Sequence, residues 1–181
     1  MKSFILILLI TISFTSCKSP EARRPISQKT GSFIKESAER NKKLVEKEEA
    51  VIAQMIEKDT SKTYIASESG FWYYYNVKVE KDTITAKFGD IVNFDYNVKD
   101  FKGQTIYSDE EITADNYSMD QEELFTGLRE GLKLMKPGET VTFLFPSQKA
   151  YGYYGDTKKI GTNVPLICEV TVNSITQTQN D

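Results

Sequence analysis

The sequence contains no histidine and only two cysteines, and these absences exclude several kinds of catalytic chemistry. Without histidine, the chain has no Ser–His or Cys–His nucleophile pair and no histidine-based metal site. The two cysteines, Cys17 and Cys168, lie far apart, and no Cys-x-x-Cys motif occurs. A glycine-rich phosphate-binding loop is also absent. We therefore expect the protein to work without a metal ion and without a cofactor.

The chain also lacks the excess of positive charge that is typical of nucleic-acid binders. It carries 23 Lys and Arg against 26 Asp and Glu, a net charge of −3, so we expect no nucleic-acid partner. Aromatic residues are abundant, with 10 Tyr, 10 Phe and 1 Trp, and such residues favour β-strands. A length of 181 residues is enough for one ordinary domain and an additional segment.

Residues 1–16 have the features of a lipoprotein signal peptide. Lys2 is followed by the apolar run FILILLI (residues 4–10), which is too short to span a bilayer. The segment ends in FTSC (residues 14–17), which resembles a bacterial lipobox, where the cysteine is acylated and becomes the first mature residue. We expect Cys17 to anchor the protein to a membrane of the bacterial cell envelope, with its domain in the periplasm. The alternative is an ordinary secretory signal that happens to precede a cysteine.

The next two segments predict a tether and a long charged helix. Residues 17–31 are polar and contain two prolines, which is typical of a flexible tether. Residues 32–60 are rich in Glu and Lys and place apolar residues at alternating three- and four-residue steps, as in an amphipathic helix. Asn41 and Glu48 interrupt this apolar stripe. Two interpretations stay open: a solvated helix that lies on its own domain, or a helix that dimerises or lifts the domain off the membrane.

The remainder of the chain combines strand patterns with one helix, an order typical of the α+β class. Residues 120–135 predict the helix, with Asp120 as its N-cap, Glu123 completing a capping box, and Pro137-Gly138 ending it. Residues 64–70 are expected to be a connector and residues 146–165 a long loop rich in Tyr and Gly. The predicted strands are residues 71–79, 91–100, 104–108, 140–145 and 166–175.

Six motifs in this half, taken in order, resemble the FKBP-type peptidyl-prolyl cis–trans isomerases. They are GDIVNFDY (89–96), GQTIYS (103–108), LFTGLREG (124–131), MKPGE (135–139), AYG (150–152) and PLICEV (165–170). The resemblance covers residues 69–175 and leaves a polar tail, residues 176–181. It implies an FKBP-like half-open antiparallel β-sheet wrapped over one short α-helix. With the lipobox, the charged helix and the aromatic strand, the chain also resembles the gliding-motility-associated isomerase lipoproteins of gliding bacteria.

The same resemblance implies an apolar pocket lined by ten residues. Those in catalytic positions are Tyr96, Phe125 and Tyr151. Those in substrate-binding positions are Ile106, Tyr107, Tyr117, Leu124, Leu128, Ile160 and Cys168. The chain departs from the family at four of these positions or beside them. Leu128 stands at the floor of the pocket, where well-known members have Trp. Ile106-Tyr107 stands where Phe-Asp is usual, so a buried carboxylate is missing. Cys168 replaces a Phe, and Gly161-Thr162 replaces the two prolines that usually follow Ile160.

The implied activity is prolyl isomerisation of proline-containing polypeptides, which would assist the folding of exported or envelope proteins and link the protein to gliding motility. An apolar cavity favours the twisted amide, because twisting removes resonance and leaves the carbonyl less polar. Two alternatives stay open. One is a non-catalytic peptide-binding scaffold or chaperone that uses the same pocket. The other is a structural lipoprotein whose N-terminal helix contacts other envelope or motility proteins, or a second copy of the chain.

Overall fold

The computed structural model of this chain describes residues 30–81 and 84–178. The predicted signal peptide (1–16), Cys17 and nearly all of the tether (17–31) therefore lie outside the described residues, as do the last three residues of the predicted tail. The chain divides into two units at Ala38. The sheet and the site described below belong to the unit from Glu39 to Asp181.

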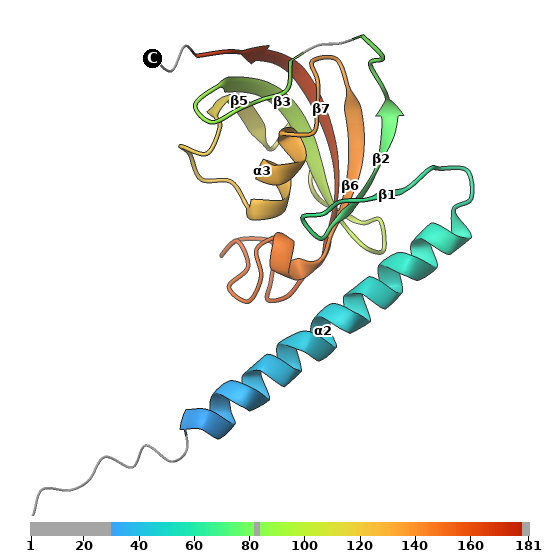
Figure 1. Cartoon of the computed structure of the whole chain (residues 1–181), viewed down its shortest axis with the longest axis vertical. Coiled ribbons are helices and arrows are strands. Elements are labelled where there is room, and N and C mark those ends of the chain that lie inside the picture. The colour runs from blue at the N-terminus through green and yellow to red at the C-terminus, as the bar shows by residue number, and fades with distance from the viewer. Residues whose placement is uncertain (1–29, 82–83, 179–181) are drawn as a thin grey trace, which may run out of the picture. The chain divides into compact units, whose positions relative to one another are not determined.

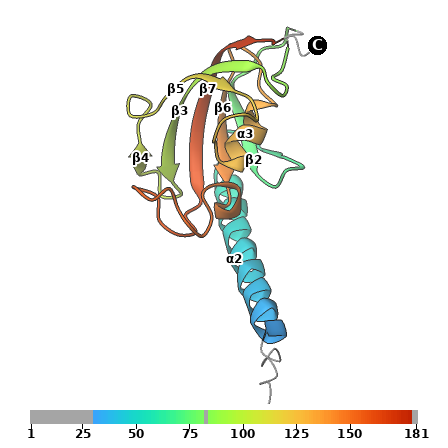
Figure 2. The same cartoon turned by 90° about the vertical axis from the view of Figure 1, so that its left-hand side faces the viewer.

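Seven antiparallel strands form one sheet around a short helix, α3 (Thr126–Leu132). The strands run in the order β1-β2-β6-β7-β3-β4, and β5 pairs with β3 beside β4. Figures 1 and 2 show α3 lying against one face of this sheet. The predicted α+β fold, with an open antiparallel sheet over one short helix, is confirmed. The strands are β1 (Ile65–Ala66), β2 (Trp72–Val77), β3 (Ile91–Asp100), β4 (Thr105–Tyr107), β5 (Thr113–Ser118), β6 (Thr140–Phe145) and β7 (Leu166–Thr176).

Strand β3 shows why the alternating sequence pattern folds as it does. Its even-numbered residues from Val92 to Val98 are buried, and the residues between them are at least partly exposed, because successive side chains of a strand point to opposite faces. β7 pairs along its whole length on one side, whereas β5 and β4 share the other side. The register shifts between Asn93 and Phe94, where a bulge bends a strand. Tyr96 lies on the buried face beyond this point.

The aromatic residues form the centre of the core. Phe71 packs edge-on against Phe143 and Phe145, with ring centroids 5.7 and 5.3 Å away, and the latter two rings stack at 5.3 Å. Such pairs contribute about 0.5–1.5 kcal/mol each beyond the burial of their surface. Tyr73 and Tyr75 pack against the same core, and the strand predicted over residues 71–79 is present as β2.

Helix α3 approaches the sheet through two glycines. A β-carbon at Gly127 would lie 2.5 Å from Cδ1 of Phe145, and one at Gly131 would lie 2.9 Å from Cε1 of Phe143. Both distances are shorter than a carbon contact allows, so any other residue would push the helix away. The glycines therefore set how closely the helix lies above the rings of β6.

The predicted helix over residues 120–135 is wrong at both ends, because α3 has only seven residues. Asp120 has a φ of 60°, a left-handed conformation that an N-cap residue does not adopt. Instead its carboxylate accepts ion pairs from Arg129 (3.5 Å) and Lys133 (3.0 Å), which project from the helix. The chain between Asp120 and Phe125 is consequently a loop. Strand β1 also lies inside the predicted connector, and β5 was not predicted.

Helix α2 (Thr30–Lys58) agrees with the predicted helix within two residues at each end. Phe33 and Ile34 are 65% and 64% exposed, so the N-terminal part of the apolar stripe is not buried. Burial begins further along the helix, where Ile52 is fully buried and Glu48 is only 6% exposed. Glu48, which interrupts the apolar stripe in the sequence, therefore lies on the buried face of helix α2. In the described part of the chain, no helix has the length and hydrophobicity needed to cross a membrane.

Candidate functional site

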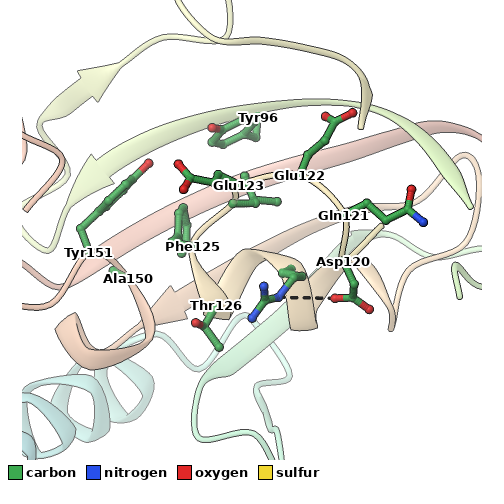
Figure 3. A pocket seen from close by; sticks show the side chains of 11 residues that line it. Tyr96, Asp120, Gln121, Glu122, Glu123, Phe125, Thr126, Ala150 and Tyr151 are labelled. Carbon is green, nitrogen blue, oxygen red and sulfur yellow. Dashed lines mark ion pairs between the residues drawn. The ribbon is translucent and has the colours of Figure 1, made fainter. Parts of the chain in front are cut away.

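A cavity of about 610 Å³ opens between the sheet, the loop that precedes α3, and the segment after the short 3₁₀ helix η2 (Ser147–Lys149). Figure 3 shows the side chains that surround it. Strand β3 contributes Tyr96, and the segment after η2 contributes Ala150 and Tyr151. The remaining lining residues come from the loop and the start of α3: Asp120, Gln121, Glu122, Glu123, Leu124, Phe125, Thr126 and Arg129.

One wall of the cavity is aromatic. The rings of Phe125 and Tyr151 lie 5.1 Å apart at an angle of 47°, and Phe125 also packs edge-on against Phe145 at 5.4 Å. Tyr96 lies across the cavity, its ring 5.5 Å from that of Phe94 in the core. Phe125 and Tyr96 are 8% and 6% exposed, so their positions are fixed by packing. This wall offers a rigid apolar surface to a small ring.

The two tyrosines also offer hydroxyl groups. Among the described residues, the hydroxyls of Tyr96 and Tyr151 have no hydrogen-bond partner. Burial raises the pKa of Tyr151 to about 12, and the nearby carboxylate of Asp156 adds to this effect. Burial also raises the pKa of Tyr96, and the electrostatic effect of the neighbouring Tyr151 is the next largest cause of this rise. Both hydroxyls therefore keep their protons near neutral pH and can donate to a carbonyl oxygen.

Part of the cavity lining is acidic, which the sequence did not predict. Asp120, Glu122 and Glu123 form this acidic lip. Arg129 also lines the cavity, but it pairs with Asp120, and no ion pair to Glu122 or Glu123 occurs within the described residues. In Figure 3 the carboxylate of Glu123 points toward the space between the two tyrosines. No group of acidic or cysteine side chains in the described ranges is placed to hold a metal ion.

Four of the ten predicted pocket residues line the cavity: Tyr96, Leu124, Phe125 and Tyr151. Ile106 and Tyr107 are half-buried on β4 and pack against the core without lining the cavity. The other four are buried inside the core: Tyr117, Leu128, Ile160 and Cys168. Leu128 and Cys168 have no exposed surface, so neither can touch a ligand in this conformation. Burial also raises the pKa of the Cys168 thiol, which makes it unreactive.

Tyr117 has a supporting position beneath the acidic lip. Its ring packs edge-on against Phe94 at 6.2 Å, and its hydroxyl donates to the backbone oxygen of Glu122 at 3.2 Å. Tyr117 therefore fixes the course of the loop without touching the cavity.

Tyr107, which stands where the carboxylate beside Ile106 is usual, binds a carboxylate from a distant loop. The hydroxyl of Tyr107 donates to the carboxylate of Asp156, which also accepts from the backbone N–H groups of Lys158 and Ile160, each at 2.8 Å. Burial raises the pKa of Asp156, but these hydrogen bonds outweigh it and hold the pKa below its usual value. No spacing in the sequence could have revealed this pair, because 49 residues separate its members.

Four other lining residues were not predicted, although they stand next to predicted pocket residues in the sequence. Asp120, Gln121, Glu122 and Glu123 directly precede the predicted pair Leu124-Phe125. The predicted helix over residues 120–135 includes them as its N-cap and first turn. The positive φ of Asp120 folds them toward the cavity instead.

Comparison with known proteins identifies the family of this chain. The family model described as FKBP-type peptidyl-prolyl cis-trans isomerase matches residues 82–173, half of the chain. A probable FKBP-type peptidyl-prolyl cis-trans isomerase FkpA from Neisseria meningitidis is 30% identical over 135 residues. The match covers 75% of this chain and 47% of that relative, so the chain spans about half the length of the curated relative that it matches.

Two crystal structures share the fold. A peptidyl-prolyl cis-trans isomerase from Pseudomonas syringae superimposes with a TM-score of 0.60 at 17% identity, over 75% of this chain and 96% of that one. FkpA from Escherichia coli superimposes with a TM-score of 0.59 at 21% identity, over 97% of this chain and 83% of that one. At these identities, the likeness establishes the fold.

Proposed function

The chain belongs to the FKBP-type peptidyl-prolyl cis-trans isomerase family, and on that premise we propose that it isomerises X–Pro bonds in proline-containing polypeptides. The observation that carries this proposal is the aromatic wall of Phe125 and Tyr151, with Tyr96 facing it across the cavity. Both tyrosine hydroxyls are free to bind a peptide. Such a pocket, mostly rigid and with few donors, suits a proline ring flanked by carbonyl groups.

The proposed mechanism is conformational and involves no covalent step. The barrier of about 18–20 kcal/mol comes from the partial double bond of the amide. The aromatic wall holds the proline ring, and the hydroxyl of Tyr151 donates to a peptide carbonyl oxygen, so that one side of the bond is fixed while the other rotates. Because the twisted amide is less polar than the planar one, the apolar wall binds it better. The reaction needs hydrogen-bond donors and no base, which agrees with the raised pKa values of both tyrosines.

We expect the purified protein to accelerate exchange of a Leu-Pro or Phe-Pro peptide at a rate that is nearly constant between about pH 5.5 and about pH 8.5. The pKa of Tyr151 is raised to about 12 and that of Tyr96 is raised as well, so neither donor titrates in this range. NMR exchange spectroscopy on the peptide measures the rate directly. A sigmoidal dependence near neutral pH would contradict donation by the tyrosines. Peptide binding without acceleration would instead establish the non-catalytic scaffold or chaperone.

We further propose that the protein acts on exported or envelope proteins, as a lipoprotein in the periplasm. The support is the lipobox-like sequence that ends at Cys17. The resemblance to gliding-motility-associated lipoproteins adds motility proteins to the candidate clients.

We expect the mature protein to begin at an acylated Cys17 and to fractionate with membranes. Each buried CH₂ of an acyl chain contributes about 0.8 kcal/mol of membrane affinity, so several chains would hold the protein firmly. Intact-mass spectrometry of the mature protein is the direct measurement. Cys17→Ser should leave the protein soluble or unprocessed, whereas Cys168→Ala, at the buried cysteine, should still fractionate with membranes. A free thiol at Cys17, or cleavage elsewhere, would leave a plain secreted protein.

A further inference from the structure

Glu48 of helix α2 is a buried polar side chain that the proposed mechanism does not use. It is 6% exposed, and its Oε2 atom accepts a hydrogen bond from the backbone N–H of Ser147 at 2.8 Å. Its second carboxyl oxygen, Oε1, is buried without a partner among the described residues. An unpartnered buried oxygen destabilises a fold, whereas the hydrogen bond from Ser147 compensates the burial of the other oxygen. The helix already has an apolar anchor one turn further on, the fully buried Ile52.

The residue that Glu48 binds leads directly to the cavity. Ser147 is buried and begins η2, and its backbone oxygen accepts the N–H groups of Ala150 at 3.1 Å and Gly152 at 2.8 Å. Tyr151 lies between these two tied residues. Two hydrogen bonds accepted by one backbone oxygen therefore fix the chain on both sides of Tyr151, although the N–H of Ala150 also donates to the oxygen of Pro146 at 3.2 Å. Glu48 fixes the residue that carries the shared oxygen.

Two cavities lie beside the contact between Glu48 and Ser147. A cavity of about 260 Å³ adjoins it, lined by Leu44, Glu48 and Val51 of α2 together with Phe101 and Pro165, among others. A second cavity, of about 160 Å³, lies between α2 and the segment of η2, and Ser147 and Gly152 line it. The hydrogen bond from Ser147 to Glu48 therefore joins α2 to the segment that carries Tyr151 beside these two cavities.

We propose that Glu48 is a positioning residue, which fixes Tyr151 in the cavity through Ser147 and so couples helix α2 to the isomerase site. The inference rests on the proposed function. It gives the N-terminal helix a role in catalysis, in addition to any role as a spacer. A helix that only supported the domain would need the packing of Ile52 and not the carboxyl group of Glu48.

The test compares three variants of the full mature protein. Glu48→Leu removes the acceptor and leaves the buried N–H of Ser147 unpaired, so we expect it to fold but to unfold at a lower urea concentration than the wild type, and its kinetics are measured where urea denaturation shows that it is folded. We expect its kcat for a Leu-Pro peptide to fall about tenfold, with a smaller change in KM, because Tyr151 is no longer held in place. Glu48→Gln keeps an acceptor oxygen and should retain kcat within about twofold. Glu49→Leu, at the exposed neighbouring position, should change neither quantity.

Amide hydrogen exchange supplies a readout that does not depend on activity. The N–H groups of Ala150 and Gly152 should exchange faster in Glu48→Leu than in the wild type, and at the wild-type rate in Glu48→Gln. If the wild type proves inactive, the proposed function fails, but the exchange rates still decide whether Glu48 holds this segment. Wild-type kcat together with wild-type exchange in a folded Glu48→Leu protein would overturn the inference. So would an equal loss of kcat in Glu48→Gln, because that variant keeps the acceptor.

Discussion

Replacing Tyr151 by Phe is expected to lower kcat/KM for prolyl isomerisation about fivefold to tenfold without changing the fold. The substitution removes only the hydroxyl, which has no partner among the described residues and keeps its proton because burial raises the pKa of Tyr151 to about 12. A neutral hydrogen bond contributes about 1 kcal/mol, and each 1.4 kcal/mol corresponds to about a tenfold change in rate. Tyr151→Ala should cost about 100-fold, because the ring that packs on Phe125 at 5.1 Å is also lost.

Tyr153→Phe is the matched control for this experiment. Tyr153 lies two residues further along the same loop and is 71% exposed, outside the cavity lining. It should leave kcat/KM unchanged, and circular dichroism should show that all three variants fold. Wild-type kcat/KM in Tyr151→Phe would mean that the hydroxyl does not bind the substrate, and that only the apolar wall acts.

Replacing Gly127 by Ala is expected to destabilise the protein by about 1–3 kcal/mol, the usual effect of overpacking a close contact. The new β-carbon would lie 2.5 Å from Cδ1 of Phe145 and 2.7 Å from the backbone oxygen of Lys149. The ring could rotate away, but the backbone oxygen belongs to η2 and cannot move alone. Urea denaturation followed by circular dichroism measures the change. Isomerase activity should fall as well, because α3 and η2 flank the cavity on both sides.

Gly161→Ala is the control for a glycine without close neighbours. A β-carbon there would meet no atom within 4 Å, and Gly161 does not have a positive φ. Its free energy of unfolding should change by no more than about 0.5 kcal/mol. If Gly127→Ala unfolded at the same urea concentration as Gly161→Ala, helix α3 would be free to shift on the sheet, and the close approach would not be a fixed feature.

Much of the sheet was predictable from the sequence, because its signals are local. The alternation of β3 placed Val92, Phe94 and Tyr96 on one face, and the structure buries all three. The aromatic strand β2 and the final strand β7 followed from the same two-residue period. The position of Tyr151 beside Phe125 was implied by the family resemblance alone, since nothing local distinguishes a loop tyrosine in a pocket from one on the surface.

What the sequence did not reveal depends on contacts between distant residues. Aspartate is a common N-cap residue, but the carboxylate of Asp120 forms ion pairs with Arg129 and Lys133 instead. The helix begins six residues later. The pair of Tyr107 and Asp156 exists only after the long loop has folded over β4. Glu48 seemed to interrupt an apolar stripe, because the backbone N–H that it binds lies 99 residues away.

The acidic lip gives the mouth of the cavity a negative electrostatic potential. Arg129 and Lys133 compensate Asp120, and the carboxylates of Glu122 and Glu123 are left without a cation in the described part of the chain. Such a field extends over a Debye length of about 8 Å at physiological ionic strength, far enough to act on the side chains that flank an approaching X–Pro bond. We therefore expect unfolded segments with Lys or Arg beside the proline to be captured faster than acidic ones, and we expect added salt to reduce the difference. A pocket with this charge would select polypeptides electrostatically before it contacts the proline ring.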